Sequence, residues 1–256
     1  MYPAKYMSLK ASVNLWLKWC LAQGIDPANF LWQVQVLMDR CLPKKNCMCI
    51  VRPTNAGKTV IIANPLIAIA KYCGRVTNAA VASNFAWQDC SNQRLISVEE
   101  ALFAGEHQEK LKQLAGGETC TVDRKHMTAI QIERTPMLLT ANYDRWQTNV
   151  SNKDPLLARM FYHRVISLPF LERMTMPLHP GIYYFLLTFM RKQTGVTTSV
   201  TYVPFSLSTD NIDELHHMIE EFSVTLDDDM SDVDDDDEDE EPAAKYSRMA
   251  DAISFD

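Results

Sequence analysis

The chain has 256 residues, the length of one large domain or two small ones, and 47% of them are hydrophobic, which excludes a wholly disordered chain. Its longest apolar stretch, Val60 to Ala70, is broken by Asn64-Pro65, and no signal peptide opens the chain, so no membrane partner is expected. From Asp227 onward fourteen acidic and two basic residues give a charge of −12, which leaves +5 for the body of the chain. Seven cysteines without a C-x-x-C pair argue against a disulfide framework or zinc site and favour a reducing compartment.

The first 43 residues are expected to form a small helical subdomain of the oligomerisation type. Ser8–Leu21 places its apolar residues in a broad helical stripe, and Gly24 ends that helix. Asp26-Pro27 then begins a second helix that reaches about Leu42.

From residue 44 to residue 205 short apolar strands alternate with helical patterns. The expected strands are Cys47–Val51, Leu95–Val98, Pro136–Thr140 and Arg164–Leu168. The expected helices are Thr59–Tyr72, with a kink at Pro65, Gln108–Leu114, Asp154–Phe161 and Gly181–Gln193. This alternation predicts an α/β fold with a parallel sheet flanked by helices. Residues 206–256 form a C-terminal segment whose acidic run, 227–241, is expected to be disordered.

The strongest motif is Arg52–Thr59, RPTNAGKT, which lies between an apolar strand and an apolar helix. A phosphate-binding loop reads G-x-x-x-x-G-K-[ST]: its backbone N–H groups surround the phosphates, its lysine neutralises them, and its hydroxyl binds Mg²⁺. Arg52 stands in place of the first glycine, and the alternative is a chance turn. The candidate nucleotide-binding residues are Pro53, Thr54, Asn55, Ala56, Gly57, Lys58 and Thr59.

Two carboxylates, Glu99 and Glu100, end the strand LISVEE about forty residues later. ATP hydrolysis needs one acid to hold Mg²⁺ and its water and another to activate the attacking water. By itself the pattern also fits acids that cap the end of a strand, but its position after a phosphate loop favours the catalytic interpretation.

Two further features follow. Leu114–Arg134 fits a hairpin with Lys125 and His126 at a basic tip, which is either a probe for the phosphate backbone of DNA or a solvated turn. The strand PMLLTAN ends in Asn142, whose amide either positions a water against a phosphate or is an ordinary turn residue.

Taken together, these motifs resemble the superfamily 3 helicase domain of parvovirus replication proteins, including those of adeno-associated viruses. The resemblance covers about Lys44 to Leu168. The matching segments are RPTNAGKT, NFAWQDC (Asn84–Cys90), LISVEE, LAGGETCTVDRKHM, TPMLLTAN and PLLARMF (Pro155–Phe161). It implies an AAA+-like P-loop ATPase that uses ATP and Mg²⁺ and forms a hexameric ring around single-stranded DNA in the nucleus of a host cell. Viral or host replication proteins are the further partners that it implies.

The resemblance also assigns residues. Lys58 and Thr59 would bind phosphate and Mg²⁺, and Glu99 and Glu100 would be the Mg²⁺ contact and the base that activates water. Asn142 would sense the γ-phosphate. Lys125 and His126 would hold DNA, and Arg159 would be an arginine finger that reaches the ATP of a neighbouring subunit.

The chain departs from the family pattern at several positions. Arg52 replaces a glycine, Ser97-Val98 replaces an aromatic pair, and Met127 replaces a second hairpin lysine. No His-hydrophobe-His triplet of an origin-nicking nuclease is present, which suggests a helicase segment without its nuclease. Three hypotheses remain: a DNA helicase motor, a catalytically impaired nucleotide- or DNA-binding protein that assembles with or inhibits an active ring, and another P-loop ATPase. The acidic run is either a solubilising tail or a segment that competes with DNA.

Overall fold

The computed structural model divides the chain into two compact units. The described residues are 5–76, 85–100, 103, 106–144, 150–195, 202 and 217–219. The sheet unit comprises Gln33–Thr59 and Tyr72–Arg173, and the helical unit comprises Met1–Trp32, Val60–Lys71 and Met174–Asp256. The acidic run 227–241 and Asn84 of the motif NFAWQDC lie outside the described residues. The domain limits expected at residues 43 and 205 stay predictions.

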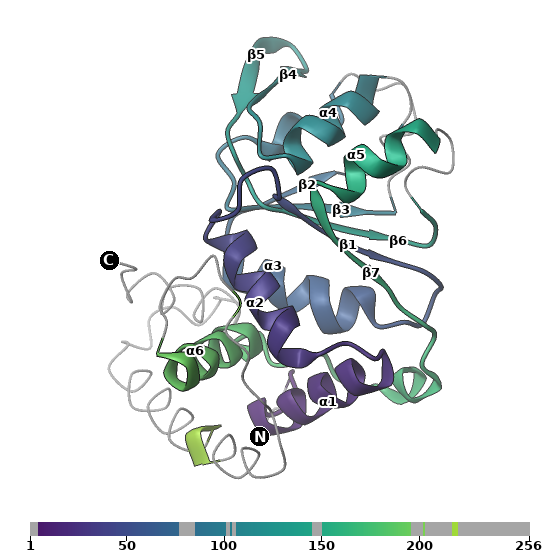
Figure 1. Cartoon of the computed structure of the whole chain (residues 1–256), viewed down its shortest axis with the longest axis vertical. Helices are drawn as coiled ribbons and strands as arrows, with labels where there is room; N and C mark the ends of the chain where they lie inside the picture. Colours follow the sequence, from purple (N-terminus) through teal and green to yellow (C-terminus); the bar gives the residue numbers. More distant parts are fainter. Residues whose placement is uncertain are drawn as a thin grey trace. The chain divides into compact units, whose positions relative to one another are not determined.

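A five-stranded parallel sheet forms the centre of the sheet unit (Figure 1). In spatial order its strands are β2 (Cys73–Val76), β3 (Leu95–Glu99), β6 (Met137–Ala141), β1 (Cys47–Val51) and β7 (Met160–Arg164). Because all strands run in the same direction, the segments that follow them emerge at one edge. The predicted α/β fold with a parallel sheet is confirmed.

The central strand β1 is apolar along its whole length. All five side chains of β1 are fully buried, as is typical of a central parallel strand. One face packs against α4 (Glu106–Ala115) and α5 (Lys153–Leu157), which lie side by side in Figure 1. The core on this face includes Cys47, Cys49, Val51, Ile96, Val98, Met137, Leu139, Leu111, Leu114 and Leu156. Each large apolar side chain buried in this way contributes about 1.5–3 kcal/mol, so the sheet is a rigid base for the loops at its edge.

Asn46 fixes the start of β1. Its buried side-chain amide donates to the carbonyl oxygens of Leu114 and Thr135, at 3.0 and 2.6 Å. Its backbone N–H donates to the carbonyl of Ala115, and its own carbonyl accepts the N–H of Met137, both at 2.9 Å. One residue thereby ties β1 to the end of α4 and the start of β6, which sets the position of everything that follows β1.

Aromatic side chains form the core of the helical unit. Its helices include α1 (Leu9–Ala22), α3 (Asn64–Ala70) and α6 (Ile182–Thr194), and α2 (Pro27–Met38) begins in this unit and ends in the sheet unit. Trp16 on α1 packs edge-on against Phe30 and Tyr183, and its indole N–H donates to the Tyr183 hydroxyl at 3.1 Å. Burial raises the pKa of Tyr183, so this hydroxyl stays protonated.

Some helices and strands begin or end at other residues than the sequence predicts. The last strand was expected at Arg164–Leu168 but is Met160–Arg164, and the helix expected at Asp154–Phe161 ends at Leu157. These two predictions were wrong because apolar residues on both sides of Arg159 fit either element. β2 was missed, since its sequence CGRV is short and holds a glycine and a charge. No helix among the described residues combines the length and apolarity that a membrane span requires.

The helix after the phosphate loop also differs from the prediction. Lys58–Ala63 forms a π-helical segment, and the α-helix begins only at Asn64, with Pro65 in its first turn. A proline is well tolerated there because the first N–H groups of a helix have no partner within it. Pro65 therefore lies at the start of an α-helix rather than inside one, and the segment changes from π-helix to α-helix just before it.

Acid should destabilise the sheet unit through His163, a residue of β7. Its Nε2–H donates to Gln33 Oε1 at 2.7 Å, and burial lowers its pKa from 6.5 to about 4. The folded protein excludes a proton that the unfolded chain binds below pH 6.5, so this stability is complete above pH 6.5 and is lost as the pH falls through 4. We expect His163→Gln to flatten the pH dependence of the free energy of unfolding by up to about 1.4 kcal/mol per pH unit in that window. Urea denaturation between pH 4 and 7 measures it, and an unchanged slope would contradict the assignment.

Candidate nucleotide-binding site

The loop that follows β1 has the backbone of an anion cradle. Arg52, Asn55 and Gly57 have φ angles of 110°, 60° and 82°, which lie in the left-handed region. Left-handed residues set among right-handed ones turn successive N–H groups toward one point, where they bind anions. The loop passes directly into the helical segment that begins at Lys58. Pro53, Thr54 and Asn55 are exposed, whereas Ala56, Gly57 and Lys58 are buried. The backbone therefore fits the phosphate groups that the motif predicts.

Lys58 is only 7% exposed although it carries a positive charge. Its Nζ donates to the carbonyl oxygens of Arg52 and Pro53, the latter at 3.0 Å, and to Asn142 Oδ1 at 2.7 Å. These three oxygens replace the water that an ammonium group loses when it is buried. The lysine is therefore held between the start of the phosphate loop and the end of β6.

The two carboxylates reach the same edge of the sheet. Glu99 ends β3 and pairs in register with Thr140 of β6, and the N–H of Glu100 donates to the Thr140 carbonyl at 3.0 Å. Asn142 directly follows β6. Because β3, β6 and β1 are neighbours and parallel, the acids, Asn142 and the phosphate loop gather at their carboxyl ends.

The oxygen donors at this edge suit a magnesium ion. Thr59, next to Lys58, offers a hydroxyl, and Glu99 offers a carboxylate. Hard oxygen ligands of this kind are the ones that Mg²⁺ prefers, and it commonly takes the remainder from substrate phosphates and water. Within the part of the chain that the structure describes, no group of three or more His, Cys, Asp or Glu could hold a metal ion unaided. The hydroxyl of Thr59 and the carboxylate of Glu99 fit an ion whose other ligands come from nucleotide phosphates and water.

Arg159 lies at the amino ends of the strands, away from the carboxyl ends where the phosphate loop lies. It directly precedes β7, whose first residue, Met160, pairs with Cys47 at the start of β1. Its Nη1 donates to the Pro155 carbonyl at 2.8 Å, and its buried Nε lies where a Cβ on Gly116 would be only 3.1 Å away. The five residues of a strand, at about 3.3 Å each, separate Arg159 from the phosphate loop by roughly 16 Å. The structure therefore does not bring Arg159 to the phosphate loop of its own chain.

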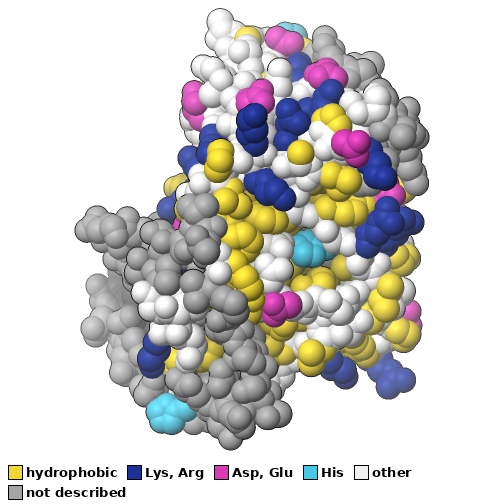
Figure 2. All heavy atoms as spheres, viewed as in Figure 1, with side chains coloured by type: hydrophobic (Ala, Val, Ile, Leu, Met, Phe, Trp, Pro, Cys, Tyr) yellow, Lys and Arg dark blue, Asp and Glu magenta, His cyan; other side chains and the backbone are white. Residues whose placement is uncertain are grey.

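The predicted hairpin is present, and its tip is basic. It consists of β4 (Cys120–Arg124) and β5 (Met127–Ile132) and stands clear of the parallel sheet in Figure 1. Arg124 pairs with Met127, so that Lys125 and His126 form the two-residue turn, and both are exposed. Elsewhere on this face of the sheet unit, Figure 2 shows Lys and Arg side chains mixed with Asp and Glu. The hairpin therefore presents Lys125 and His126 to solvent at its tip, as the sequence predicts.

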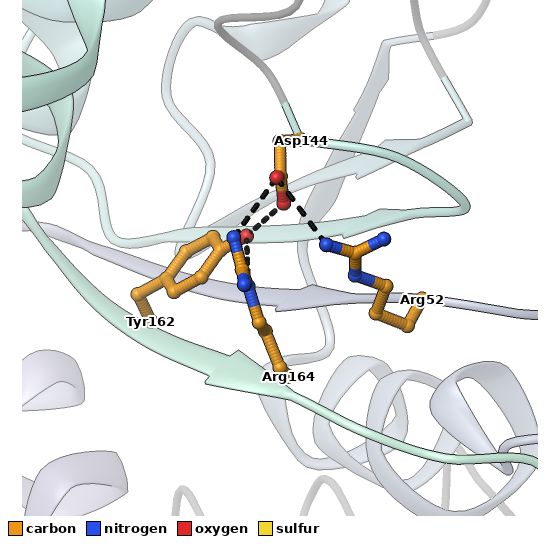
Figure 3. A network of polar contacts seen from close by, with 4 residues as sticks. All are labelled: Arg52, Asp144, Tyr162 and Arg164. Carbon is orange, nitrogen blue, oxygen red and sulfur yellow. Dashed lines mark hydrogen bonds and ion pairs between the residues drawn. The ribbon is translucent and has the colours of Figure 1, made fainter.

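A polar network at the phosphate loop was not anticipated from the sequence (Figure 3). Asp144 Oδ2 accepts from Arg164 Nη2 at 3.0 Å and from Arg52 Nη2 at 3.5 Å, and Asp144 Oδ1 accepts from the Tyr162 hydroxyl. Burial, and the hydrogen bond to the carboxylate, raise the pKa of Tyr162, so its hydroxyl remains a donor. The first loop residue is thereby tied to the ends of β6 and β7. Tyr162 and Arg164, two polar residues at alternate positions of β7, were the signal in the sequence for this network. Their partner Asp144 lies about twenty residues earlier in the chain, which is why the network was missed.

The comparison with protein families gives one decisive match. The profile described as parvovirus non-structural protein NS1 matches residues 7–166, which include the phosphate loop, the paired acids, the hairpin and Asn142. The chain belongs to this NS1 family. The match confirms the resemblance to parvovirus replication proteins that the motifs carry.

Individual relatives of this NS1-family chain are distant. The initiator protein NS1 of human bocavirus 4 is 26% identical over 65% of the chain, and that of feline panleukopenia virus is 33% identical over 50%. The replication protein E1 of European elk papillomavirus is 33% identical over 48% of the chain. The matched part covers only 21%, 29% and 20% of these three proteins, so the chain spans a small share of the curated relatives it matches.

A solved structure of JCV helicase shares the fold. The two superpose with a TM-score of 0.51 at 14% identity, over 85% of this chain and 61% of that one. This likeness confirms the predicted AAA+-like P-loop architecture. The chain is thus similar in sequence to NS1 and E1 proteins and similar in fold to JCV helicase.

Proposed function

We propose that this chain is the ATP-dependent DNA helicase motor of a parvovirus-like replication protein. It forms a ring, a hexamer in the simplest case, and couples ATP hydrolysis to movement along single-stranded DNA in the nucleus of a host cell, with viral or host replication proteins as partners. The observation that carries the proposal is the bond from Lys58 Nζ to Asn142 Oδ1 at 2.7 Å. It joins the phosphate loop to the strand next to the paired acids, which is the arrangement that ATP cleavage needs.

The residues at the carboxyl edge divide the chemistry between them. The loop N–H groups and Lys58 bind the phosphates and offset the charge of the transferred phosphoryl group. Glu100 takes a proton from a water whose oxygen bonds to the γ-phosphorus as the bond to the β-phosphate oxygen breaks. The Asn142 amide orients this water or contacts the γ-phosphate. Thr59 and Glu99 would hold Mg²⁺, which supplies further positive charge to the phosphate oxygens when bound.

The position of Arg159 supports a ring. An arginine at the amino ends of the strands, roughly 16 Å from the loop of its own chain, would act on the ATP of a neighbouring copy rather than on its own. An arginine that acts in this way stabilises charge in the transition state of phosphoryl transfer. Hydrolysis would then require assembly, since neither copy contains a complete site.

A second candidate is a nucleotide- or DNA-binding protein that has lost turnover and assembles with or inhibits an active ring. Arg52 is the observation that favours it, because a side chain occupies the position where phosphate loops have glycine. The two candidates differ in one measurement. A single-turnover ATPase assay, with and without single-stranded DNA, detects cleavage only for the motor.

We expect Lys58→Ala to lower the rate of ATP hydrolysis by at least about 100-fold, because it removes the charge that faces the transferred phosphoryl group. Glu100→Gln should lower hydrolysis to a similar extent but leave ATP bound, since an amide cannot act as a base. Radiolabelled ATP, followed by filter binding and by phosphate release, separates binding from cleavage.

Lys153→Ala is the matched control for Lys58→Ala, because Lys153 also stands at the start of a helix but is exposed. Unchanged turnover in Lys58→Ala would remove the motor hypothesis. Loss of ATP binding in Glu100→Gln would give Glu100 a structural role instead.

Arg159→Ala should leave nucleotide binding nearly intact but reduce hydrolysis, because the arginine acts on the ATP of another copy. Mixing Arg159→Ala protein with Lys58→Ala protein should restore part of the activity, since some interfaces then combine an intact loop with an intact arginine. ATPase rates are measured across mixing ratios, with co-assembly verified by size-exclusion chromatography. Absence of rescue in rings that contain both variants would contradict a role across the interface.

Lys125→Ala should weaken binding to single-stranded DNA about equally for all sequences, because the hairpin tip contacts phosphates rather than bases. The dependence of log affinity on log salt concentration should become shallower by about 0.7 for the lost contact. Fluorescence anisotropy with labelled oligonucleotides at several salt concentrations measures both quantities. Lys18→Ala on α1, also exposed, is the control, and an equal effect of both variants would argue against the hairpin.

A further inference from the structure

Arg52 has a backbone conformation that an arginine rarely adopts. Its φ angle of 110° lies in the region where a side chain is strained and glycine is not, and glycine is the residue that the loop motif has at this position. Such a conformation persists only where the surrounding contacts hold it. The contacts of Arg52 must therefore compensate for the absence of glycine.

The backbone of Arg52 is needed in this conformation. Its N–H donates to the Ala141 carbonyl at 2.9 Å, which fixes the loop to the end of β6. Its carbonyl accepts from Lys58 Nζ, as does the carbonyl of Pro53 next to it. A rotation of Arg52 toward an ordinary φ angle would move both carbonyls away from the lysine.

The side chain of Arg52 has a charged partner in Asp144. Their ion pair measures 3.5 Å, and Asp144 is only 12% exposed, so it lies in a region where charge interactions are screened less than at the surface. The carboxylate is itself fixed by the Tyr162 hydroxyl and by Arg164 at 3.0 Å, both from β7 (Figure 3). Asp144 is thus a rigid acceptor, and the guanidinium that it holds belongs to the strained residue.

We propose that Asp144 is a positioning residue of the phosphate loop, which holds Arg52 in the conformation that glycine provides elsewhere and so keeps the Arg52 and Pro53 carbonyls on Lys58. The inference rests on the proposed binding of a nucleoside triphosphate by this loop. It explains how the loop keeps the shape of an anion cradle with arginine as its first residue. The dependence on Asp144 should vanish when residue 52 is glycine.

The test is a double-mutant cycle on the full chain. Asp144→Asn is introduced into the natural protein and into Arg52→Gly protein, and two properties are measured in each background. Amide hydrogen exchange at residues 54–59 without nucleotide reports the order of the loop, and isothermal titration with Mg·ATP reports affinity. Asp123→Asn, at an exposed position of β4, is the matched control, and Lys58→Ala tests the site itself.

In the natural background we expect Asp144→Asn to speed loop exchange and to weaken ATP binding by about tenfold, the effect of losing one charge-assisted contact. In the Arg52→Gly background the same change should alter either property by less than about twofold, because glycine adopts this φ angle without help. Equal effects in both backgrounds would overturn the proposal and show that Asp144 acts only through its contacts with Tyr162 and Arg164 of β7. No effect in either background would overturn it as well.

The two readouts separate this inference from the proposed function. If neither the natural protein nor any variant binds ATP, the nucleotide site is wrong, whereas loop exchange still decides whether Asp144 acts through Arg52. If ATP binds and Lys58→Ala abolishes binding, but the cycle shows no coupling, the site stands and the role of Asp144 fails.

Discussion

The buried ammonium of Lys58 is the constraint on which the rest of the site depends. A positive charge that is 7% exposed requires oxygen atoms around it, and three oxygens from two segments supply them. Two belong to the first residues of the phosphate loop and one to Asn142, so satisfying this charge fixes both the shape of the loop and its distance from β6. The parallel sheet then adds the paired acids at the same edge, because β3 is the other neighbour of β6.

Much of this could be predicted from sequence because the signals are local. The strand Cys47–Val51 and the hairpin around Lys125 are each set by a short run of residue types, and both are confirmed. The predicted limits of the last strand were wrong because the apolar residues on both sides of Arg159 fit a helix as well as a strand. The Arg52–Asp144 pair joins residues 92 positions apart, and no spacing rule connects them. Local chemistry therefore predicts elements and motifs, whereas contacts between distant side chains require the fold.

The same sheet separates two halves of the proposed reaction. Residues that bind and cleave a nucleotide gather at the carboxyl ends of the strands, while Arg159 is packed beside Gly116 at the amino ends. The five-residue length of β1 keeps Arg159 and the phosphate loop apart within one chain. Assembly would then be a condition of catalysis rather than a means of stability, and an isolated copy would bind ATP without consuming it.

The φ angle of Arg52 has a consequence for the history of the chain. If the carboxylate at position 144 compensates for a side chain at position 52, the order in which substitutions can be accepted is restricted. A lineage that loses Asp144 first passes through a poorly ordered loop, whereas one that first regains glycine at position 52 can change residue 144 freely afterwards. Among relatives of this chain, arginine at the first loop position should therefore occur together with an acidic residue two positions after the asparagine that follows β6. Relatives with glycine at the first loop position should tolerate any residue there.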